Sequence, residues 1–189
     1  MGTKHSFKIP CLVFIRHGEA VRQRGDHKRS LSEKGRLQAL KCADNLALIP
    51  FDLIISSSAK RAAETAEIIR RRNCPEIAIE IIPELYLPVE DVDKQAVLHM
   101  LNDLGPVSLD CFIEQDHAGA WKRYSEGAYK AFAKAIKKYA SQNILIVAHA
   151  NIINDLGLRF APRAKELLST YFGHCEGFLI NRDGKVKFL

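Results

Sequence analysis

No apolar run in this 189-residue sequence approaches the roughly 20 residues needed to cross a bilayer, and no apolar signal-type segment precedes the first predicted strand. The five cysteines are odd in number and widely spaced, with no C-x-x-C pair. This pattern argues against a disulfide framework or a zinc site and favours a reducing compartment. We therefore expect a cytoplasmic protein that binds no membrane and needs no metal or cofactor.

Negative charge is in the minority, since 28 Lys and Arg residues face 22 Asp and Glu residues and give a net charge of +6. The basic residues are scattered, and aromatic residues do not interleave with them as they do on a nucleic-acid platform. A nucleic-acid partner is therefore not expected. Internal repeats and low-complexity linkers are absent too, so residues 1–189 are predicted to form a single domain.

Short apolar runs alternate with amphipathic segments along the chain. The runs predict strands at 11–15, 51–56, 77–84, 143–148 and 177–180, with a hairpin turn at 181–184 that leads into 185–189. Helices are predicted between them, at 32–49, 59–72, 89–104, 120–140 and 151–160. This alternation predicts an α/β fold, a three-layer sandwich whose mostly parallel, mixed sheet is covered by helices on both faces.

Serine residues are predicted to cap the first two helices. Ser32 would cap the first, and the pair 57–58 would cap the second. The apolar positions of the first helix recur at helical spacing and are Leu37, Leu40, Ala43 and Leu46 or Ala47. The segment 105–125 is the least regular and is too long for an ordinary connection. We expect it to be an irregular excursion near a site, where it would shape the choice of substrate without entering the chemistry.

Charged or titratable residues stand at the ends of four predicted strands. Arg16 and His17 end the first, Glu84 the third and His149 the fourth, while Arg61 lies in the first turn of the helix after the second. Each residue alone also suits an ordinary surface role. Because the carboxyl ends of parallel strands share one edge of the sheet, we expect the five side chains to cluster there.

Two arginines and two histidines around one point suit a phosphoryl dianion. A neutral imidazole can attack phosphorus, and nearby guanidiniums would hold its pKa down and neutralise the equatorial oxygens. A carboxylic acid must protonate the leaving oxygen, and either Glu84 or Asp26 could do so. Glu84 is favoured, because the basic residues around Asp26 should keep that carboxyl ionised.

Several stretches together resemble the histidine phosphatase superfamily, which includes the cofactor-dependent phosphoglycerate mutases. These stretches are FIRHGEA, SLSEKGRLQA, SSSAKRAAETAEII, IPELY and IVAHA, in the order of the family. The resemblance implies that His17 is the phosphorylated nucleophile and that Arg16, Arg61 and His149 complete the phosphate pocket.

Within that superfamily, GDHKRSLSEKG and IPELYLPVEDV look most like the small bacterial protein-phosphohistidine phosphatases. Arg22 and Gln23 stand where a mutase usually has tryptophan and asparagine, and Ala150 stands where a glycine is common. The implied function is a metal-independent phosphatase that hydrolyses a phosphorylated small molecule or phosphoprotein, as a phosphomonoester or phosphohistidine, through a phosphohistidine on His17. The alternatives are a phosphomutase of the same fold and a catalytically silent phosphate-binding module.

Overall fold

The structure is a computed structural model that describes residues 11–22, 25–87, 91–139 and 142–189. Its strands are β1 Cys11–Arg16, β2 Leu53–Ser56, β3 Ile79–Ile81, β4 Asn143–Ala148, β5 Gly177–Ile180 and β6 Val186–Phe188. Its α-helices are α1 Glu33–Leu46, α2 Lys60–Asn73, α3 Asp91–Leu104, α4 Leu109–Glu114, α5 Ala120–Ile136, α6 Ala150–Phe160 and α7 Glu166–Ser169. Short 3-10 turns form η1 Asp26–Lys28, η2 Pro83–Leu85 and η3 Lys137–Tyr139.

The strands form one mixed sheet in the order β3-β2-β4-β1-β5-β6. Neighbours among β3, β2, β4 and β1 are parallel, whereas β5 and β6 are antiparallel to their neighbours. Arg16 is in register with Ala148, and Ser56 with Val147. The residues that follow β1, β2 and β4 therefore emerge side by side at one edge of the sheet.

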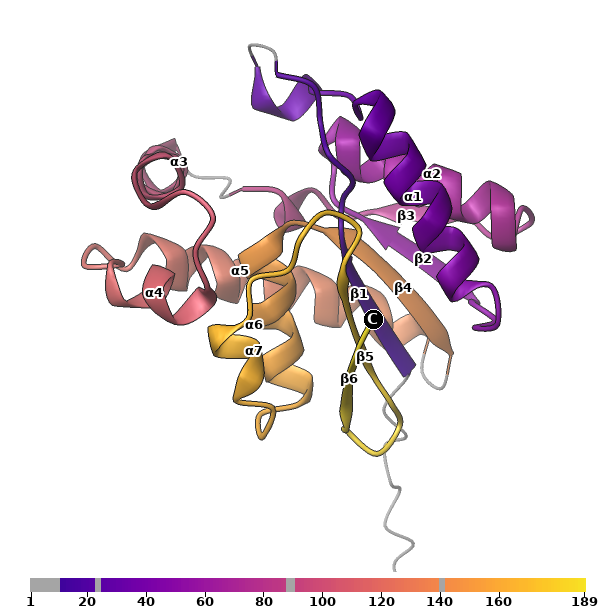
Figure 1. The fold of residues 1–189 in the computed structure, drawn as a ribbon. Coiled ribbons are helices and arrows are strands. Elements are labelled where there is room, and N and C mark those ends of the chain that lie inside the picture. The colour runs from indigo at the N-terminus through magenta and orange to yellow at the C-terminus, as the bar shows by residue number, and fades with distance from the viewer. Residues whose placement is uncertain (1–10, 23–24, 88–90, 140–141) are drawn as a thin grey trace, which may run out of the picture.

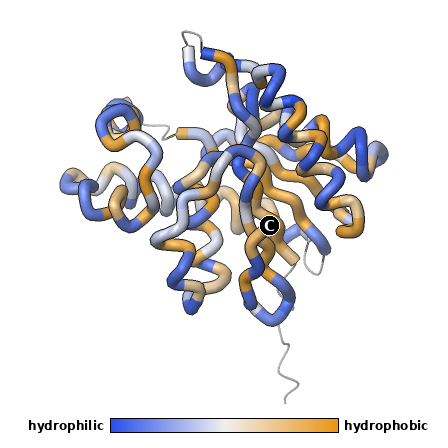
Figure 2. Tube along the Cα trace, viewed as in Figure 1, coloured by the Kyte–Doolittle hydropathy of each residue, from blue (hydrophilic) through white to orange (hydrophobic). Residues whose placement is uncertain are grey.

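Successive strand residues point to opposite faces of the sheet, and two hydrophobic clusters result. Leu12 and Phe14 belong to the cluster that includes residues of α5, α6 and α7. Val13 and Leu145 belong to the cluster that includes residues of α1 and α2. The helices flank the sheet on its two sides in Figure 1, and Figure 2 shows apolar residues concentrated along the strands between them. The predicted three-layer α/β sandwich is confirmed.

The buried face of α1 differs from the prediction. Ser32 does cap the helix, since its hydroxyl accepts from the Gly35 amide at 3.0 Å. Ala43 and Leu46 are buried as predicted, together with Gly35, Ala39 and Cys42, but Leu37 and Leu40 are 66% and 42% exposed. The reason is a close approach at Gly35, where an added Cβ would lie 2.0 Å from the carbonyl oxygen of Glu19. This backbone contact sets the rotation of the helix.

The serine pair before α2 does not cap it, which corrects the prediction. The N-cap residue is Ala59, which has no capping side chain. Ser57 Oγ instead lies 2.9 Å from His149 Nε2, and Ser58 Oγ lies 3.1 Å from His27 Nε2. The two serine side chains thus form hydrogen bonds with histidines from other parts of the chain.

The segment 105–125 is more regular than expected, because it contains α4 and the start of α5. Its Phe112 and Trp121 side chains are buried, with ring centroids 4.8 Å apart. Figure 1 shows α3 and α4 beside α5, away from the sheet. The predicted helix at 89–104 is seen from Asp91 onward, and its first residues lie outside the described ranges. Among the described residues, no helix is long and apolar enough to span a membrane.

Candidate active site

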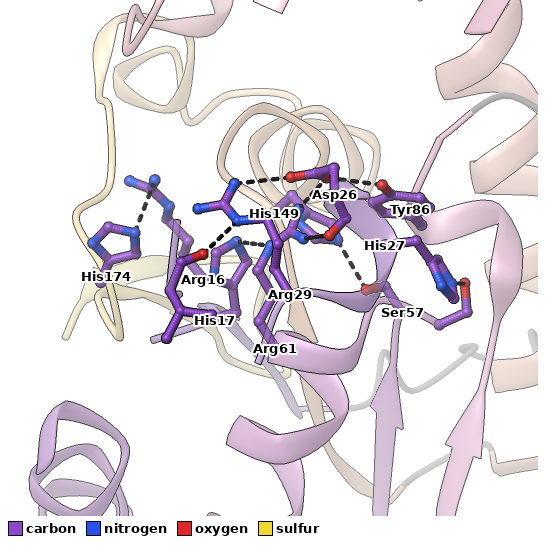
Figure 3. Close-up of polar contacts among 12 residues, drawn as sticks. Arg16, His17, Asp26, His27, Arg29, Ser57, Arg61, Tyr86, His149 and His174 are labelled. Atoms are coloured by element: carbon purple, nitrogen blue, oxygen red, sulfur yellow. Dashed lines mark hydrogen bonds and ion pairs between the residues drawn. The ribbon is translucent and has the colours of Figure 1, made fainter. Parts of the chain in front are cut away.

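The ends of β1 and β4 and the first turn of α2 bring Arg16, His17, Arg61 and His149 together (Figure 3). The ring centroids of His17 and His149 are 5.0 Å apart. Arg61 reaches both rings, with Nε 2.9 Å from His17 Nε2 and Nη2 3.4 Å from His149 Nδ1. All four residues line one cavity of about 170 Å³.

His17 is buried, and its hydrogen bonds select one tautomer. Nδ1–H donates to the carbonyl oxygen of Gly18 at 2.7 Å, since a carbonyl can only accept. The lone pair of the neutral ring is therefore on Nε2, where it accepts from Arg61. Burial, followed by the nearness of the titratable His149 ring and the charge of Arg61, lowers the pKa of His17 well below its usual value. The ring is neutral near pH 7, as a nucleophile must be.

Arg61 is a cation with only 6% of its surface exposed. Besides the bond to His17, its Nη1 donates to the carbonyl oxygen of Asp26 at 2.6 Å, and its Nη2 donates to Asp26 Oδ2 at 2.9 Å. The helix turn that carries it is tied to β1 through Thr65, whose hydroxyl donates to the Arg61 carbonyl and accepts from the Gly18 amide. A guanidinium held in this way presents planar donors at a fixed place, as oxyanion binding requires.

Arg16 is held from the opposite side by the segment before β5. Its Nη1 donates to the carbonyl oxygen of Phe172 at 2.8 Å, and its Nη2 lies 3.3 Å from His174 Nε2. The guanidinium also lies over the Tyr171 ring, 5.0 Å from the centroid. Burial and the charge of Arg16 lower the pKa of His174 to about 4, so that ring is neutral and can accept from the guanidinium.

His149 is the second imidazole of the site and follows β4. Because a guanidinium only donates, Nδ1 of His149 accepts from Arg61 and Nε2–H donates to Ser57 Oγ. Burial and the charges of Arg61 and Arg16 lower its pKa well below the usual value. His149 is therefore neutral when the pocket holds no anion, and a bound dianion would raise its affinity for a proton.

The two candidate acids lie in different surroundings. Asp26 lines the cavity, and its carboxylate accepts from Arg61, from Arg29 and from the Tyr86 hydroxyl. Its partial burial alone raises the pKa, but these donors outweigh it and the net pKa is lowered. Glu84 is half-buried on η2 and is not among the described residues that line the cavity around His17.

Three residues of the site were not predicted to belong to it: Tyr86, Ser57 and His174. Tyr86 reaches Asp26 at 2.8 Å, and its ring lies 5.5 Å from that of His149. His174 precedes β5, which is antiparallel to β1, so it lies at the edge where the parallel strands end. Recognising the last hairpin as antiparallel to the first strand would have placed His174 there.

The chemistry available to this cluster is the binding and transfer of an anion. Two fixed guanidiniums supply positive charge, and two neutral imidazoles supply a nucleophilic nitrogen and a hydrogen-bonding partner. Within the described ranges, no group of three or more His, Cys, Asp and Glu side chains is placed to hold a metal ion.

A family model of the histidine phosphatase superfamily (branch 1) matches residues 12–168. The chain belongs to this superfamily. The match covers both histidines and both arginines of the cluster, and it implies a phosphorylated substrate. Distant relatives in the superfamily are phosphatases or phosphoglycerate mutases.

Similarity to individual members of the histidine phosphatase superfamily is low and evenly spread. The uncharacterized phosphatase PhoE of Bacillus subtilis is 25% identical over 189 residues, which cover 86% of this chain and 83% of that one. The adenosylcobalamin/alpha-ribazole phosphatase of Salmonella typhi is 28% identical over 161 residues, with 77% and 76% covered. The structure of the protein histidine phosphatase SixA with tungstate aligns with a TM-score of 0.61 at 17% identity, covering 95% and 94%. No subgroup stands out, so the expected kinship with phosphohistidine phosphatases stays a prediction.

Proposed function

We propose that the protein is a metal-independent phosphatase that works through a covalent phosphohistidine on His17. The observation that carries this proposal is the state of the His17 ring. It is buried, neutral and held in the tautomer whose Nε2 lone pair accepts from Arg61 in a cavity that Arg16 also lines.

In the first step, His17 Nε2 attacks the phosphorus atom of the bound ester. The N–P bond forms while the bond to the leaving oxygen breaks, and the departing oxygen takes a proton. Arg16 and Arg61 bind the equatorial oxygens, whose charge they stabilise in the transition state. The incoming phosphoryl group would take over Arg61 donors that now bind His17 and Asp26.

In the second step, water attacks the phosphorus atom of phosphohistidine. The N–P bond breaks, inorganic phosphate leaves, and the lone pair returns to Nε2 of His17. The Nδ1–H bond to Gly18 keeps the ring in place through both steps. Each half-reaction thus needs one proton transfer near the leaving or attacking oxygen.

Glu84 remains our candidate for the acid that protonates the leaving oxygen. The donors around Asp26 lower the pKa of that carboxyl, whereas a general acid at neutral pH needs a raised pKa. Glu84 lies two residues from Tyr86, which lines the cavity, and would act from the rim. For either residue, the protonated form must persist until the ester bond breaks.

The decisive experiment is hydrolysis of p-nitrophenyl phosphate in the presence of EDTA, followed by chemical analysis of the protein-bound phosphate. We expect turnover and an acid-labile, alkali-stable phosphoryl group that is lost in His17→Ala. The control is His117→Ala, because His117 is exposed and lies outside the cavity lining. Activity above about a tenth in His17→Ala would overturn the phosphohistidine route.

The same experiment separates the two alternatives. A phosphomutase would keep the phosphoryl group on His17 until a second acceptor arrived, so that inorganic phosphate would form slowly without one. A silent binding module would bind phosphate and release no p-nitrophenol. A screen of phosphorylated metabolites and a phosphohistidine protein would then distinguish phosphomonoesters from phosphohistidine as the substrate.

A further inference from the structure

The cavity at His17 extends beyond the charged cluster into a lobe with apolar walls. Its walls come from the segment after η2 and from α3, α5 and α6. We define this apolar lobe by Leu87, Val97, Leu98, Leu101, Trp121 and Ile152. Because the same cavity is lined by His17, a phosphoryl group at the histidine would direct its leaving group along these walls. What the lobe accepts therefore decides which esters fit.

Two unpartnered polar atoms belong to side chains that line this cavity. Trp121 is 3% exposed and Asn151 is 7% exposed. Trp121 Nε1 and Asn151 Oδ1 are both buried, and neither has a hydrogen-bond partner among the described residues. A buried donor or acceptor without a partner is costly, and proteins avoid it unless the group serves a purpose.

We propose that the apolar lobe binds the leaving group of the substrate and selects an uncharged, ring-sized, largely apolar group. Both polar atoms are closed off from the cavity, so the Trp121 ring or the Asn151 amide would turn to meet an acceptor or a donor on such a group. The inference rests on the proposed function, since the phosphoryl group anchors the other end at His17. It makes Trp121 and Asn151 specificity-determining residues of the site.

Size and polarity both support this class of leaving group. The whole cavity measures about 170 Å³ and must also hold the phosphoryl group, so the enclosed space admits no more than a single ring. For comparison, an apolar cavity of about 150 Å³ is known to bind benzene. A sugar or glycerate group would set several hydroxyl or carboxylate groups against aliphatic walls, where their lost hydration is not replaced. Phosphate esters of aromatic and heteroaromatic alcohols match this lobe.

A second open region shares Arg16, His17 and Leu101 with this cavity but has a different character. It is lined by Arg22, Arg29 and His174 as well as by Arg16. A substrate with a second anionic group would be drawn to this basic region and would leave the apolar lobe unused. This is the competing outcome that the experiment must detect.

The test measures equilibrium binding of phosphonates, which cannot be hydrolysed, so it does not depend on turnover. The ligands are methylphosphonate, benzylphosphonate and phosphonoacetate. Trp121 is the only tryptophan of the chain, so its fluorescence reports directly on the lobe. We expect benzylphosphonate to bind at least about tenfold more tightly than methylphosphonate and to change the tryptophan emission. Methylphosphonate should leave the emission nearly unchanged.

Two variants test the walls and the donor separately. Leu101→Asn should reduce the advantage of benzylphosphonate over methylphosphonate. The matched variant Leu40→Asn should keep it, because Leu40 is similarly exposed, at 42% against 38% for Leu101, but lies on α1, outside the cavity lining. Trp121→Phe keeps a ring but removes the N–H. In calorimetry at mildly alkaline pH, the wild-type protein should bind pyridinylmethylphosphonate, whose ring nitrogen can accept from Trp121, about three- to tenfold more tightly than benzylphosphonate. Trp121→Phe should remove this difference in affinity.

The outcomes separate this inference from the proposed function. Equal binding of methyl- and benzylphosphonate, an unchanged tryptophan emission, or tighter binding of phosphonoacetate than of benzylphosphonate would each overturn the inference while the phosphatase proposal stands. If no phosphonate binds and p-nitrophenyl phosphate is not hydrolysed, the proposed function itself is wrong and the inference falls with it.

Discussion

Arg61 Nε donates to His17 Nε2 at 2.9 Å, so the guanidinium covers the nitrogen that we propose to be the nucleophile. The same guanidinium holds the Asp26 carboxylate through Nη2. A substrate phosphoryl group must enter between these three groups. It therefore competes with Asp26 for the donors of Arg61, and its own charge meets a carboxylate at the cavity wall.

Asp26→Asn should strengthen the binding of inorganic phosphate. The substitution removes a negative charge beside the pocket but keeps an acceptor for Arg61 and for the Tyr86 hydroxyl. We expect the inhibition constant of phosphate to fall several-fold, and the effect to shrink in high salt. Tyr86→Phe serves as a control, because it removes one donor to Asp26 and no charge. Weaker phosphate binding in Asp26→Asn would show instead that the carboxylate is needed to orient Arg61.

Arg16→Ala and Arg61→Ala should each slow the reaction by roughly 10²–10³-fold in kcat, the usual cost of losing one transition-state donor. Arg71→Ala is the matched control on the same helix as Arg61, since the Arg71 side chain is 75% exposed and pairs with Glu67 at the surface. It should stay within about twofold. Steady-state kinetics distinguish the roles, because a change in KM alone would mean that the arginine binds substrate and transition state equally.

The proton donor is tested with two esters of equal size, one with a poor alcohol leaving group and one with a good phenol. Glu84→Gln should strongly impair the alcohol ester and largely spare the phenol ester, because only the poor leaving group needs protonation. Asp26→Asn should affect both esters alike. The reverse pattern, with Asp26→Asn impairing only the alcohol ester, would make Asp26 the acid and our assignment to Glu84 wrong.

Stability should fall as the pH drops below the ordinary histidine range. Burial, with nearby positive charge, lowers the pKa of His17, His149 and His174 in the folded protein relative to the ordinary value of 6.5. Below that value the unfolded chain binds protons that the folded protein does not, so the free energy of unfolding decreases with falling pH. For His174 the window runs from 6.5 down to about 4.

Urea denaturation at about pH 7.5 and about pH 5 measures this effect. The wild-type protein should lose stability at the lower pH. His174→Asn should lose less between the two conditions, whereas His99→Asn, at an exposed surface position of α3, should lose as much as the wild type. A pH dependence that is unchanged in His174→Asn would contradict the assignment of a lowered pKa to that ring.

Local sequence patterns determined the layers of this protein and the meeting place of its charged side chains. Each apolar run indicates a buried strand. Because the strands alternate with helices, they are predicted to form a parallel sheet whose strand ends share one edge. That rule is enough to bring Arg16, His17 and His149 to one place, because each stands directly at a strand end. It also brings Arg61 there, in the first turn of α2 after β2. The rule fails for Glu84, which lies on η2 and is not among the described residues that line the cavity.

Only the tertiary structure decided which side chains become partners. The contact of Arg61 with Asp26 spans 35 residues, and the contact of Ser57 with His149 spans 92. The sequence around one residue of such a pair does not indicate its distant partner, so Ser57 was predicted to be a helix cap. The sequence could not predict which face of α1 is exposed for the same reason, since that depends on the contact between the Glu19 backbone and Gly35. Periodicity reports how often a segment meets the core, but distances between segments are fixed only when the whole chain packs.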